Sequence, residues 1–454
     1  MHFGIKPKFR FYIYNFRETE KIEIPPEYIE TFEYSDSLDG GNFSLTFPGG
    51  GTKKLYSKQR YREYGYLREL LGVGNVIHIT ESDTRIFTGY IKSVRDSINM
   101  DGGDTMIVSG GGIEDFIKTQ PLFVDVSEIS NYLSKHLSIV GESTRGMKTP
   151  GEVVFAILSG AIDYASTRGG KTLYELMSIS DKSVSKFAYF SNLISAPNMY
   201  SGDASGNTFN YWDLASGYAK VPLYELFVHH TEDQIYRDNT TAGVGTMYLD
   251  PSIGKDYLSH VVFRPTPFEY LITNTSSEYL VVEVNQSRFD RVNLTDNLTD
   301  LFTGISLIPP FESQKTAGLI SRTLYDEENV QVFGQRVLNI SIDGYSARTK
   351  GDTSYHAELI SLQKSLFETF GDGERRVSGT FSGDYFRGIC KGKFIDIVDD
   401  DNDTKNLNPH LKRYENRFYV KGISVNANIA SGEASMDIEV QWGKWKRGGE
   451  GFGI

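Results

Sequence analysis

A group of aspartates near the C-terminal end of this sequence could bind a metal ion. The run DIVDDDND at 396–403 places Asp399, Asp401 and Asp403 at alternate positions, and carboxylate oxygens are the ligands that hard divalent cations prefer. A calcium loop of the helix–loop–helix type also needs glycine at its sixth position and glutamate at its last, and this run has neither. We interpret the run as a solvated hairpin loop and keep the three aspartates as candidate metal ligands.

Two other stretches could hold a ligand, but each has a simpler interpretation. His229 and His230, followed by Glu232 and Asp233, could bind a metal or exchange protons, yet neighbours in a strand point to opposite faces. We interpret them as polar surface residues. The glycines at 110–112 could hold a phosphate at a helix start, although a turn between a strand and a helix explains them equally well.

The familiar catalytic patterns are missing from the sequence. It contains no Gly-x-Ser-x-Gly, no His-Glu-x-x-His and no Gly-x-x-x-x-Gly-Lys-Ser/Thr motif. Paired carboxylates for glycoside hydrolysis stay possible, because their separation is spatial rather than sequential. The single cysteine, Cys390, permits neither an internal disulfide nor a cysteine metal cluster, and its strand pattern predicts burial. We predict no enzyme and no cofactor.

A basic, aromatic segment at 53–70 is the clearest candidate for a contact surface. It could be a nucleic-acid stripe, because cations alternate with aromatic rings. The formal net charge of -12 argues against that function, since phosphate contact needs a positive surface. Arg and Tyr are also enriched at protein interfaces. We therefore predict a protein contact at Arg60, Tyr61, Arg62, Tyr64, Tyr66 and Arg68.

The elements that must position these residues are mostly strands. The chain has 454 residues, and roughly 100–200 residues per domain predicts more than one domain. Alternating runs at 377–381, 388–398, 417–427 and 434–442 predict a C-terminal antiparallel sheet. Apolar residues at helical spacing predict a helix over 356–370, which we expect to lie on that small barrel. The sequence has no run of about 18 apolar residues, so we expect no membrane helix, and no signal peptide is visible.

The rest of the chain predicts a second β domain and a mixed region. Strands are expected at 9–15, 28–34, 43–47, 75–80, 85–94 and 105–109, with a hairpin turn at 35–42 and a helical turn at 113–117. Helices are expected at 127–140 and 151–164, loops at 166–219, and further strands at 223–227, 246–249, 259–264, 279–284 and 337–342. The predicted fold class is α+β, mostly antiparallel β. Its parts are a β-barrel domain at 1–120, a mixed α+β insert at 121–320 with one or two sub-domains, a β-barrel domain with one helix at 321–447, and a flexible tail at 448–454.

An internal repeat relates the two ends. NVIHI at 75–79 and FTGYIKSV at 87–94 resemble GKFIDI at 392–397 and FYVKGISV at 418–425. Each half joins a strand that opens at Gly or Asn to an aromatic, glycine-containing strand that ends in Ser-Val. We predict two related barrels at opposite ends of one chain.

The order of several motifs resembles the central baseplate-hub proteins of long-tailed bacteriophages and related contractile injection machines. The motifs are FEYSDSLDGGNFSLTFP, GNVIHI, RIFTGYIKSV, MIVSGGGIEDFI, YDEENVQVFGQR, FRGICKGKFIDI and RFYVKGISVNANIASGEASMDIEVQWG. The resemblance covers both ends and little of 121–320. It implies tube-like barrels, a homotrimer with six similar domains, and a hub that adapts a six-fold tail tube to a three-fold spike.

The resemblance also implies partners and a location. They are the chain itself, a tail-tube or tube-initiator protein and a central spike protein, in a virion tail baseplate made in the host cytoplasm. DNA or an effector would pass through without specific binding, and the chain would not insert into a membrane. Two alternatives stay open: a receptor- or glycan-binding tail module that uses the aromatic loop at 199–213, and a cell-wall-degrading enzyme.

Overall fold

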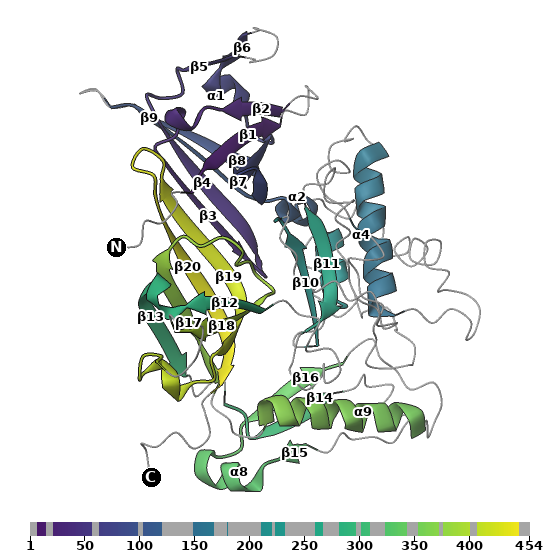
Figure 1. The fold of residues 1–454 in the computed structure, drawn as a ribbon. Coiled ribbons are helices and arrows are strands. Elements are labelled where there is room, and N and C mark those ends of the chain that lie inside the picture. The colour runs from purple at the N-terminus through teal and green to yellow at the C-terminus, as the bar shows by residue number, and fades with distance from the viewer. Residues whose placement is uncertain are drawn as a thin grey trace, which may run out of the picture.

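The main feature of the protein is a sheet of 13 strands that curls around one buried face (Figure 1). The computed structural model describes residues 7–14, 21–56, 63–98, 103–119, 149–167, 179, 210–219, 223–231, 259–266, 281–296, 301–308, 323–342, 353–371, 376–399 and 406–444. Within these residues all neighbouring strands of the large sheet except one pair are antiparallel. The predicted fold class, α+β and mostly antiparallel β, is confirmed.

The half of the sheet formed by residues 9–112 is called the N-terminal unit. β3 and β4 form the hairpin predicted at the Asp-Gly-Gly turn, where Gly40 has a φ of 137° that side chains rarely adopt. A short helix, α2 (Glu114–Lys118), follows the last strand. The strands, in chain order, are β1 (Phe9–Tyr14), β2 (Lys21–Ile24), β3 (Thr31–Ser37), β4 (Gly40–Pro48), β7 (Val76–Glu81), β8 (Thr84–Ser97) and β9 (Thr105–Gly112). In space their order is β3-β4-β9-β8-β7-β1-β2.

The other half of the sheet is called the C-terminal unit. Its strands are β12 (Val281–Asn285), β13 (Phe289–Asp296), β17 (Arg376–Asp384), β18 (Phe394–Val398), β19 (Arg417–Asn428) and β20 (Glu433–Lys444). Their order is β13-β17-β20-β19, with β18 on β19 and β12 parallel to β18. The domain boundaries stay a prediction, although β12 and β13 precede residue 321 and yet pair with strands of this unit.

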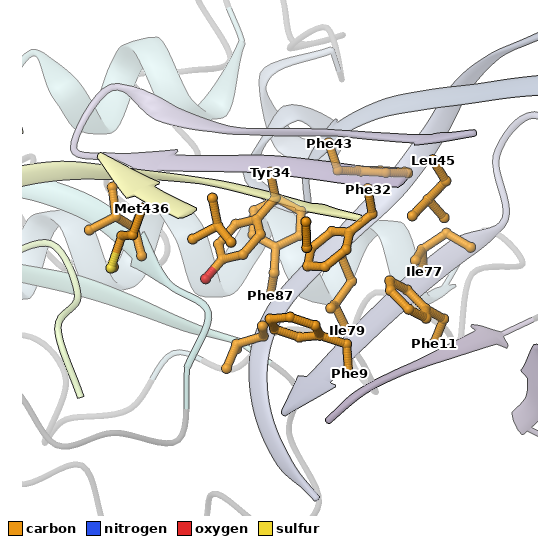
Figure 2. Packing of buried hydrophobic residues seen from close by; sticks show 14 of the residues in the cluster. Phe9, Phe11, Phe32, Tyr34, Phe43, Leu45, Ile77, Ile79, Phe87 and Met436 are labelled. Atoms are coloured by element: carbon orange, nitrogen blue, oxygen red, sulfur yellow. The ribbon is translucent and has the colours of Figure 1, made fainter. Parts of the chain in front are cut away.

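One hydrophobic core runs through both units, which Figure 2 shows from close by. Phe32 of β3 lies at its centre, with ring centroids 4.7 Å from Phe9 and 5.1 Å from Phe11. In β20, Met436, Ile438 and Val440 are buried as their alternation predicts. Trp442 leaves that face: its φ is 61°, and it stacks on Tyr419 and packs against a second core.

The second core belongs to the middle of the chain. Figure 1 shows the β10–β11 hairpin between the large sheet and helix α4, with the three-stranded sheet β15-β14-β16 and helix α9 beyond it. The elements of this middle region are α4 (Pro150–Thr167), α6 (Tyr211–Ser216), β10 (Tyr224–His229), β11 (His260–Pro265), β14 (Gly304–Ile308), β15 (Leu324–Tyr325), α8 (Glu327–Phe333), β16 (Val337–Ser341) and α9 (Thr353–Leu366). The remaining elements are β5 (Lys54–Tyr56), β6 (Glu63–Tyr66), α1 (Leu67–Leu70) and the short turns η1 (Pro26–Tyr28), η2 (Gln286–Arg288), η4 (Phe367–Gly371) and η5 (Leu411–Arg413).

Side chains at the helix starts explain why these segments become helical. Thr149 and Glu152 form a reciprocal capping box at α4, with bonds of 3.3 and 3.0 Å. Asn210 caps α6 and Asp326 caps α8, each by accepting a backbone N–H three residues on. No helix among the described residues is both long and apolar enough to cross a membrane.

The predicted packing of the last long helix is wrong. The expected stripe of Leu359, Leu362 and Leu366 is buried, but it belongs to the core of the middle region. Gln363 Nε2 donates to the carbonyl of Ile305 in β14 at 2.9 Å, which ties α9 to the three-stranded sheet. The stripe predicts a buried face without saying which surface covers it. The predicted helix at 127–140 and strand at 246–249 lie outside the described residues.

Candidate assembly interface and its buried junction

The internal repeat is present as two equivalent pairs of strands. β7 with β8 and β18 with β19 are both antiparallel. Before each pair lies a glycine with positive φ, 90° at Gly74 and 82° at Gly392. Gly74 N donates to Ile91 O at 2.8 Å, and Gly392 N donates to Val420 O at 2.9 Å. The return bonds, from the amides of Ile91 and Val420 to the residue after each glycine, are both 2.8 Å.

The register of the repeat differs from the predicted one. Both long strands contain a β-bulge, and the extra residue is Lys92 in β8 and Lys421 in β19. YIK at 90–92 therefore matches YVK at 419–421, two residues away from the match that aligns the two Ser-Val pairs. Both lysines form ion pairs at the bulge, Lys92 with Asp115 and Lys421 with Glu439. The bulged lysine marks the equivalent position in the two units.

The two units meet at a contact that we call the intramolecular seam. Beyond its bulge, β19 leaves β18 and pairs with β3, from Gly422 opposite Ser37 to Asn428 opposite Thr31. Asn426 Nδ2 also donates across the seam to Glu33 Oε1 at 2.9 Å. The N-terminal and C-terminal units therefore form one continuous sheet, although nearly the whole chain separates the two strands.

A group of buried charges, the junction, fixes the β10–β11 hairpin against this seam. Lys391 Nζ donates to Asp36 Oδ1 at 2.5 Å and to the carbonyl of Ser37 at 2.9 Å. His230 Nε2 lies 3.0 Å from Glu114 Oε2 and 3.7 Å from Asp36 Oδ1. The contact between His230 Nε2 and Glu114 Oε2 is close but lacks the alignment of a hydrogen bond. All four side chains are almost completely buried.

Hydrogen bonds to other parts of the chain hold the acid and the base in place. Gly41 N donates to Glu114 Oε1 at 2.5 Å, and His230 Nδ1 lies 3.1 Å from Ser259 Oγ. Arg85 Nε donates to the His230 carbonyl at 2.8 Å. Burial would raise the pKa of Glu114, but His230 and Lys391 outweigh it and lower the pKa to about 2. The interpretation of His229 and His230 as surface residues is wrong, because both are fully buried.

A second set of buried polar groups ties the same hairpin to the C-terminal unit. Arg264 Nε donates to Glu225 Oε2 at 2.9 Å, and Arg264 Nη2 donates to the carbonyl of Gly392, also at 2.9 Å. Tyr419 donates its hydroxyl to Glu225 at 2.7 Å. Burial, followed by the charge of Glu225, raises the pKa of Tyr419 well above its usual value, so the phenol stays a donor. The ring of Phe227 lies between both sets, 5.7 Å from Lys391 Nζ and 5.3 Å from Arg264 Cζ.

The junction explains the position of the single cysteine. Cys390 is fully buried, as predicted, and it packs with Phe227 and Val262 of the hairpin. The residues after it, Lys391 and Gly392, contribute the ammonium group and the carbonyl described above. One short loop of the C-terminal unit therefore contacts both the N-terminal unit and the β10–β11 hairpin.

Substituting alanine for Gly392 should cost more stability than the same substitution at Gly74, its equivalent in the repeat. A Cβ at Gly392 would lie 2.8 Å from Arg264 Nη2, whereas a Cβ at Gly74 would meet nothing within 4 Å. Both positions have positive φ, so alanine costs about 1 kcal/mol at each. We expect Gly392→Ala to lose roughly 1–3 kcal/mol more than Gly74→Ala, because it displaces a buried guanidinium. Urea unfolding of the two variants measures the difference, and equal losses would contradict this role of Gly392.

Lowering the pH should destabilise the β10–β11 hairpin through His260 at a higher pH than it does through the buried carboxylates. Burial, with the charge of Arg85, lowers the pKa of His260 to about 4 from its ordinary value of 6.5. Between pH 6.5 and pH 4 the unfolded chain binds a proton at His260 and the folded chain does not. The free energy of unfolding therefore falls as the pH drops through this range, by up to about 3 kcal/mol. Glu114 adds a loss of stability between its ordinary pKa of 4.5 and its lowered pKa of about 2. Urea midpoints at pH 7 and pH 4.5 test this. His260→Gln should reduce the difference between the urea midpoints at the two pH values. An unchanged difference would exclude His260 as its source.

The predicted metal ligands are not brought together in the residues that the structure describes. Asp399 is buried at the end of β18, where its Oδ2 accepts a hydrogen bond from Asn406 N at 2.9 Å. Asp401 and Asp403 lie outside the described residues. Across the described ranges no three His, Cys, Asp or Glu side chains are grouped as metal ligands would be. The contacts seen for Asp399 are those of a loop support.

Of the predicted interface residues, Tyr64 and Tyr66 lie in β6 and Arg68 lies in helix α1. Arg60, Tyr61 and Arg62 are outside the described residues, and of Tyr64 only the backbone in β6 is described. Tyr66 is 45% exposed, with Lys54 Nζ 5.1 Å from its ring centre. Arg68 Nε pairs with Asp96 Oδ2 of β8 at 2.9 Å. Their role as a contact surface stays a prediction.

The aromatic loop at 199–213 does not present its last two aromatic residues to solvent. Residues 199–209 lie outside the described ranges. Tyr211 and Trp212 are buried in the core of the middle region, where α6 packs against α4 and α2. The signal for this was the asparagine before them, since Asn210 caps a helix that turns both rings inward.

Comparisons with known proteins found similar structures but no related sequence family. No protein-family model matches the chain, and no curated protein matches it either. Among solved structures it is similar to a tail protein from Neisseria meningitidis MC58, with 8% identity, a TM-score of 0.49 and coverage of 95% of this chain and 96% of that one. It is also similar to the 43 kDa tail protein of prophage MuSo2 from Shewanella oneidensis, with 11% identity, a TM-score of 0.44 and coverage of 95% and 96%.

A third similar structure is a lidless PdpA–VgrG complex, with 10% identity, a TM-score of 0.42 and coverage of 97% of this chain and 66% of that one. These neighbours are of the kind that the order of the sequence motifs predicts. All three TM-scores lie below 0.5.

Proposed function

We propose that this chain is a structural tail component: a homotrimeric hub that adapts a six-fold tail tube to a three-fold central spike. The observation that carries the proposal is the intramolecular seam, where two equivalent units join through different strands, β19 and β3. A contact between two different surfaces is head-to-tail, and its repetition generates a closed ring when the rotation closes. Two units in each of three chains give six similar positions around a three-fold axis.

Differences between the two units support the adaptor role. β1 is antiparallel to β7 in the N-terminal unit, whereas the equivalent outer strand of the C-terminal unit, β12, is parallel to β18. A ring of alternating units is six-fold where the units agree and three-fold where they differ. The side on which they agree suits a tail-tube or tube-initiator protein, and the other side suits a spike.

The charges of the chain favour passage over binding and a structural role over catalysis. A formal net charge of -12 repels phosphate, so DNA can move through such a ring without being held. Three buried carboxylates contact basic side chains: Asp36 contacts Lys391, Glu114 contacts His230 and Glu225 contacts Arg264. These contacts give the carboxylates a structural role. We expect no hydrolysis of cell-wall sugars or peptides by the purified chain.

The mass of the purified chain in solution tests the proposal. We expect a trimer, and averaged images of it should contain six units of similar shape in a ring. A stable dimer or hexamer, or a monomer at the highest soluble concentration, would contradict a homotrimeric hub. Deleting 201–209 should leave the trimer intact. Loss of host-surface adsorption without loss of assembly would favour the receptor-binding alternative.

A further inference from the structure

Two strand edges are open in the described part of the chain, and they are equivalent to the two edges that form the intramolecular seam. Beyond its bulge β8 pairs, among the strands that the structure describes, with β9 alone, whereas the same part of β19 pairs with both β20 and β3. Within the same described strands β13 pairs with β17 alone, whereas β3, which occupies the same place in the other unit, pairs with both β4 and β19. Each unit thus has the same two edges, and one of each is unused.

At these edges the apolar residues of the two units differ in burial as they would if a neighbouring strand were missing. Ile423 and Ala427 of β19 are buried under β3, but their equivalents in β8 are Val94, which is half-buried, and Ile98, which is 77% exposed. On the other edge Phe32 and Tyr34 of β3 are buried, while the equivalent apolar residues of β13, Val292 and Leu294, are only partly buried.

The repeat fixes the register in which the open edges would pair. The bulge makes Ser93 equivalent to Gly422, so Ser97 matches Asn426. Glu33 lies opposite Ser44, and Asn293 lies opposite Thr380, which places Asn293 of β13 where Glu33 lies in β3. In the seam, Asn426 lies opposite Glu33 and donates a hydrogen bond to it. The same register brings Ser97 opposite Asn293 and exposed Ile98 opposite Val292.

We propose that residues 93–98 of one chain pair, antiparallel, with β13 of a second copy, with Ser97 opposite Asn293. This inference rests on the proposed homotrimer and names the surface that joins its chains. The partner is a second copy because the part of β8 beyond its bulge and β13 are equivalent to the two strands that pair in the seam, so each supplies the neighbour that the other lacks. Three such contacts alternate with three intramolecular seams around a closed ring. Arg68, which is bonded to Asp96, lies beside the contact.

Paired cysteines test the register. Directly opposed residues of antiparallel strands have Cβ atoms about 4.5–5.5 Å apart, close enough to form a disulfide after small adjustments. Cys390 is buried and gives no background. Ser97→Cys/Asn293→Cys should form covalent trimers under mild oxidation. Glu33→Cys/Asn426→Cys, the matched pair in the seam, should close within one chain without a change in mass. Ser97→Cys/Leu294→Cys is one residue out of register and points to opposite faces, so it should remain unlinked.

The outcomes separate this inference from the proposed function. A trimer in which Glu33→Cys/Asn426→Cys closes but Ser97→Cys/Asn293→Cys does not would overturn the pairing and leave the homotrimer standing. A ladder of ever longer covalent species would keep the pairing and overturn the closed trimer. A chain that stays monomeric and unlinked would overturn both.

A charge placed at the open edge gives a second measurement. Ile98→Asp should raise the dissociation constant of the trimer at least tenfold, since the pairing would bury an unpaired carboxylate. Val332→Asp is the matched control, because Val332 on α8 is 71% exposed and away from both edges. It should leave the dissociation constant unchanged. Equal effects of the two substitutions would contradict a contact at Ile98.

Discussion

Replacing Lys391 by methionine should lower the free energy of unfolding by about 3–5 kcal/mol, as expected when one partner of a buried ion pair is removed. Lys391 and Asp36 are both fully buried, and their contact joins residues that lie 355 positions apart in the chain. Without the ammonium group, the carboxylate of Asp36 stays in a low-dielectric site together with that of Glu114. Urea unfolding monitored by circular dichroism measures the loss.

The lysine at the bulge of β19 is the control for this prediction. Lys421 pairs with Glu439 at 2.9 Å, but both side chains are partly exposed. Water screens such a pair, so Lys421→Met should cost less than about 1 kcal/mol. Adding Asp36→Leu to Lys391→Met should recover part of the loss, because the uncompensated charge is then gone. Similar losses at Lys391 and Lys421 would mean that the buried charges do not fix the junction.

Replacing Ile438 by proline should prevent folding of the C-terminal unit. Ile438 is buried in β20 and lies opposite Phe381 of β17 on one side and Ile423 of β19 on the other. Proline removes a backbone donor inside the sheet and clashes with its neighbours, at a cost of about 3 kcal/mol or more. The lost burial of the isoleucine adds about 2–5 kcal/mol. We expect insoluble protein or the loss of cooperative unfolding.

Asp290→Pro provides a contrast within the same unit. Asp290 is skipped in the pairing of β13 with β17, so it lies in a bulge of an edge strand, where proline is tolerated. This variant should fold and unfold cooperatively. If Ile438→Pro folded equally well, β20 would not be an inner strand of the sheet.

The parts of the fold that the sequence could predict are those set by local alternation and turn chemistry. The hairpin of β3 and β4 follows from an Asp-Gly-Gly turn between two alternating runs, and β20 follows from its two-residue period. The repeat was also predictable, since each half keeps its glycine and its strand pair. Its register was not, because only the pairing partners identify the lysine as the bulged residue.

The junction could not be predicted, because its charges come from distant parts of the chain. His229 and His230 continue a mostly apolar run, YELFV, and this is the only local signal in the sequence that they belong to a core. Nothing near them indicates Lys391 or Glu114. Strand β13 was not predicted for a related reason. Its polar residues are exposed, and its apolar residues are only partly buried because a strand pairs with it on one side alone among the described residues.

The intramolecular seam has a consequence for how fast and how faithfully a ring could be built. Because both partners of the seam belong to one polypeptide, every second contact forms at the effective concentration set by the tether, independently of the amount of protein in the cell. If the six units were separate subunits, translational and rotational freedom would be lost at every contact. With two units in each chain, that freedom is lost only at the contacts between chains, which are half of the total. The fused arrangement also fixes the alternation of the two unlike units, so that no mixed order can arise.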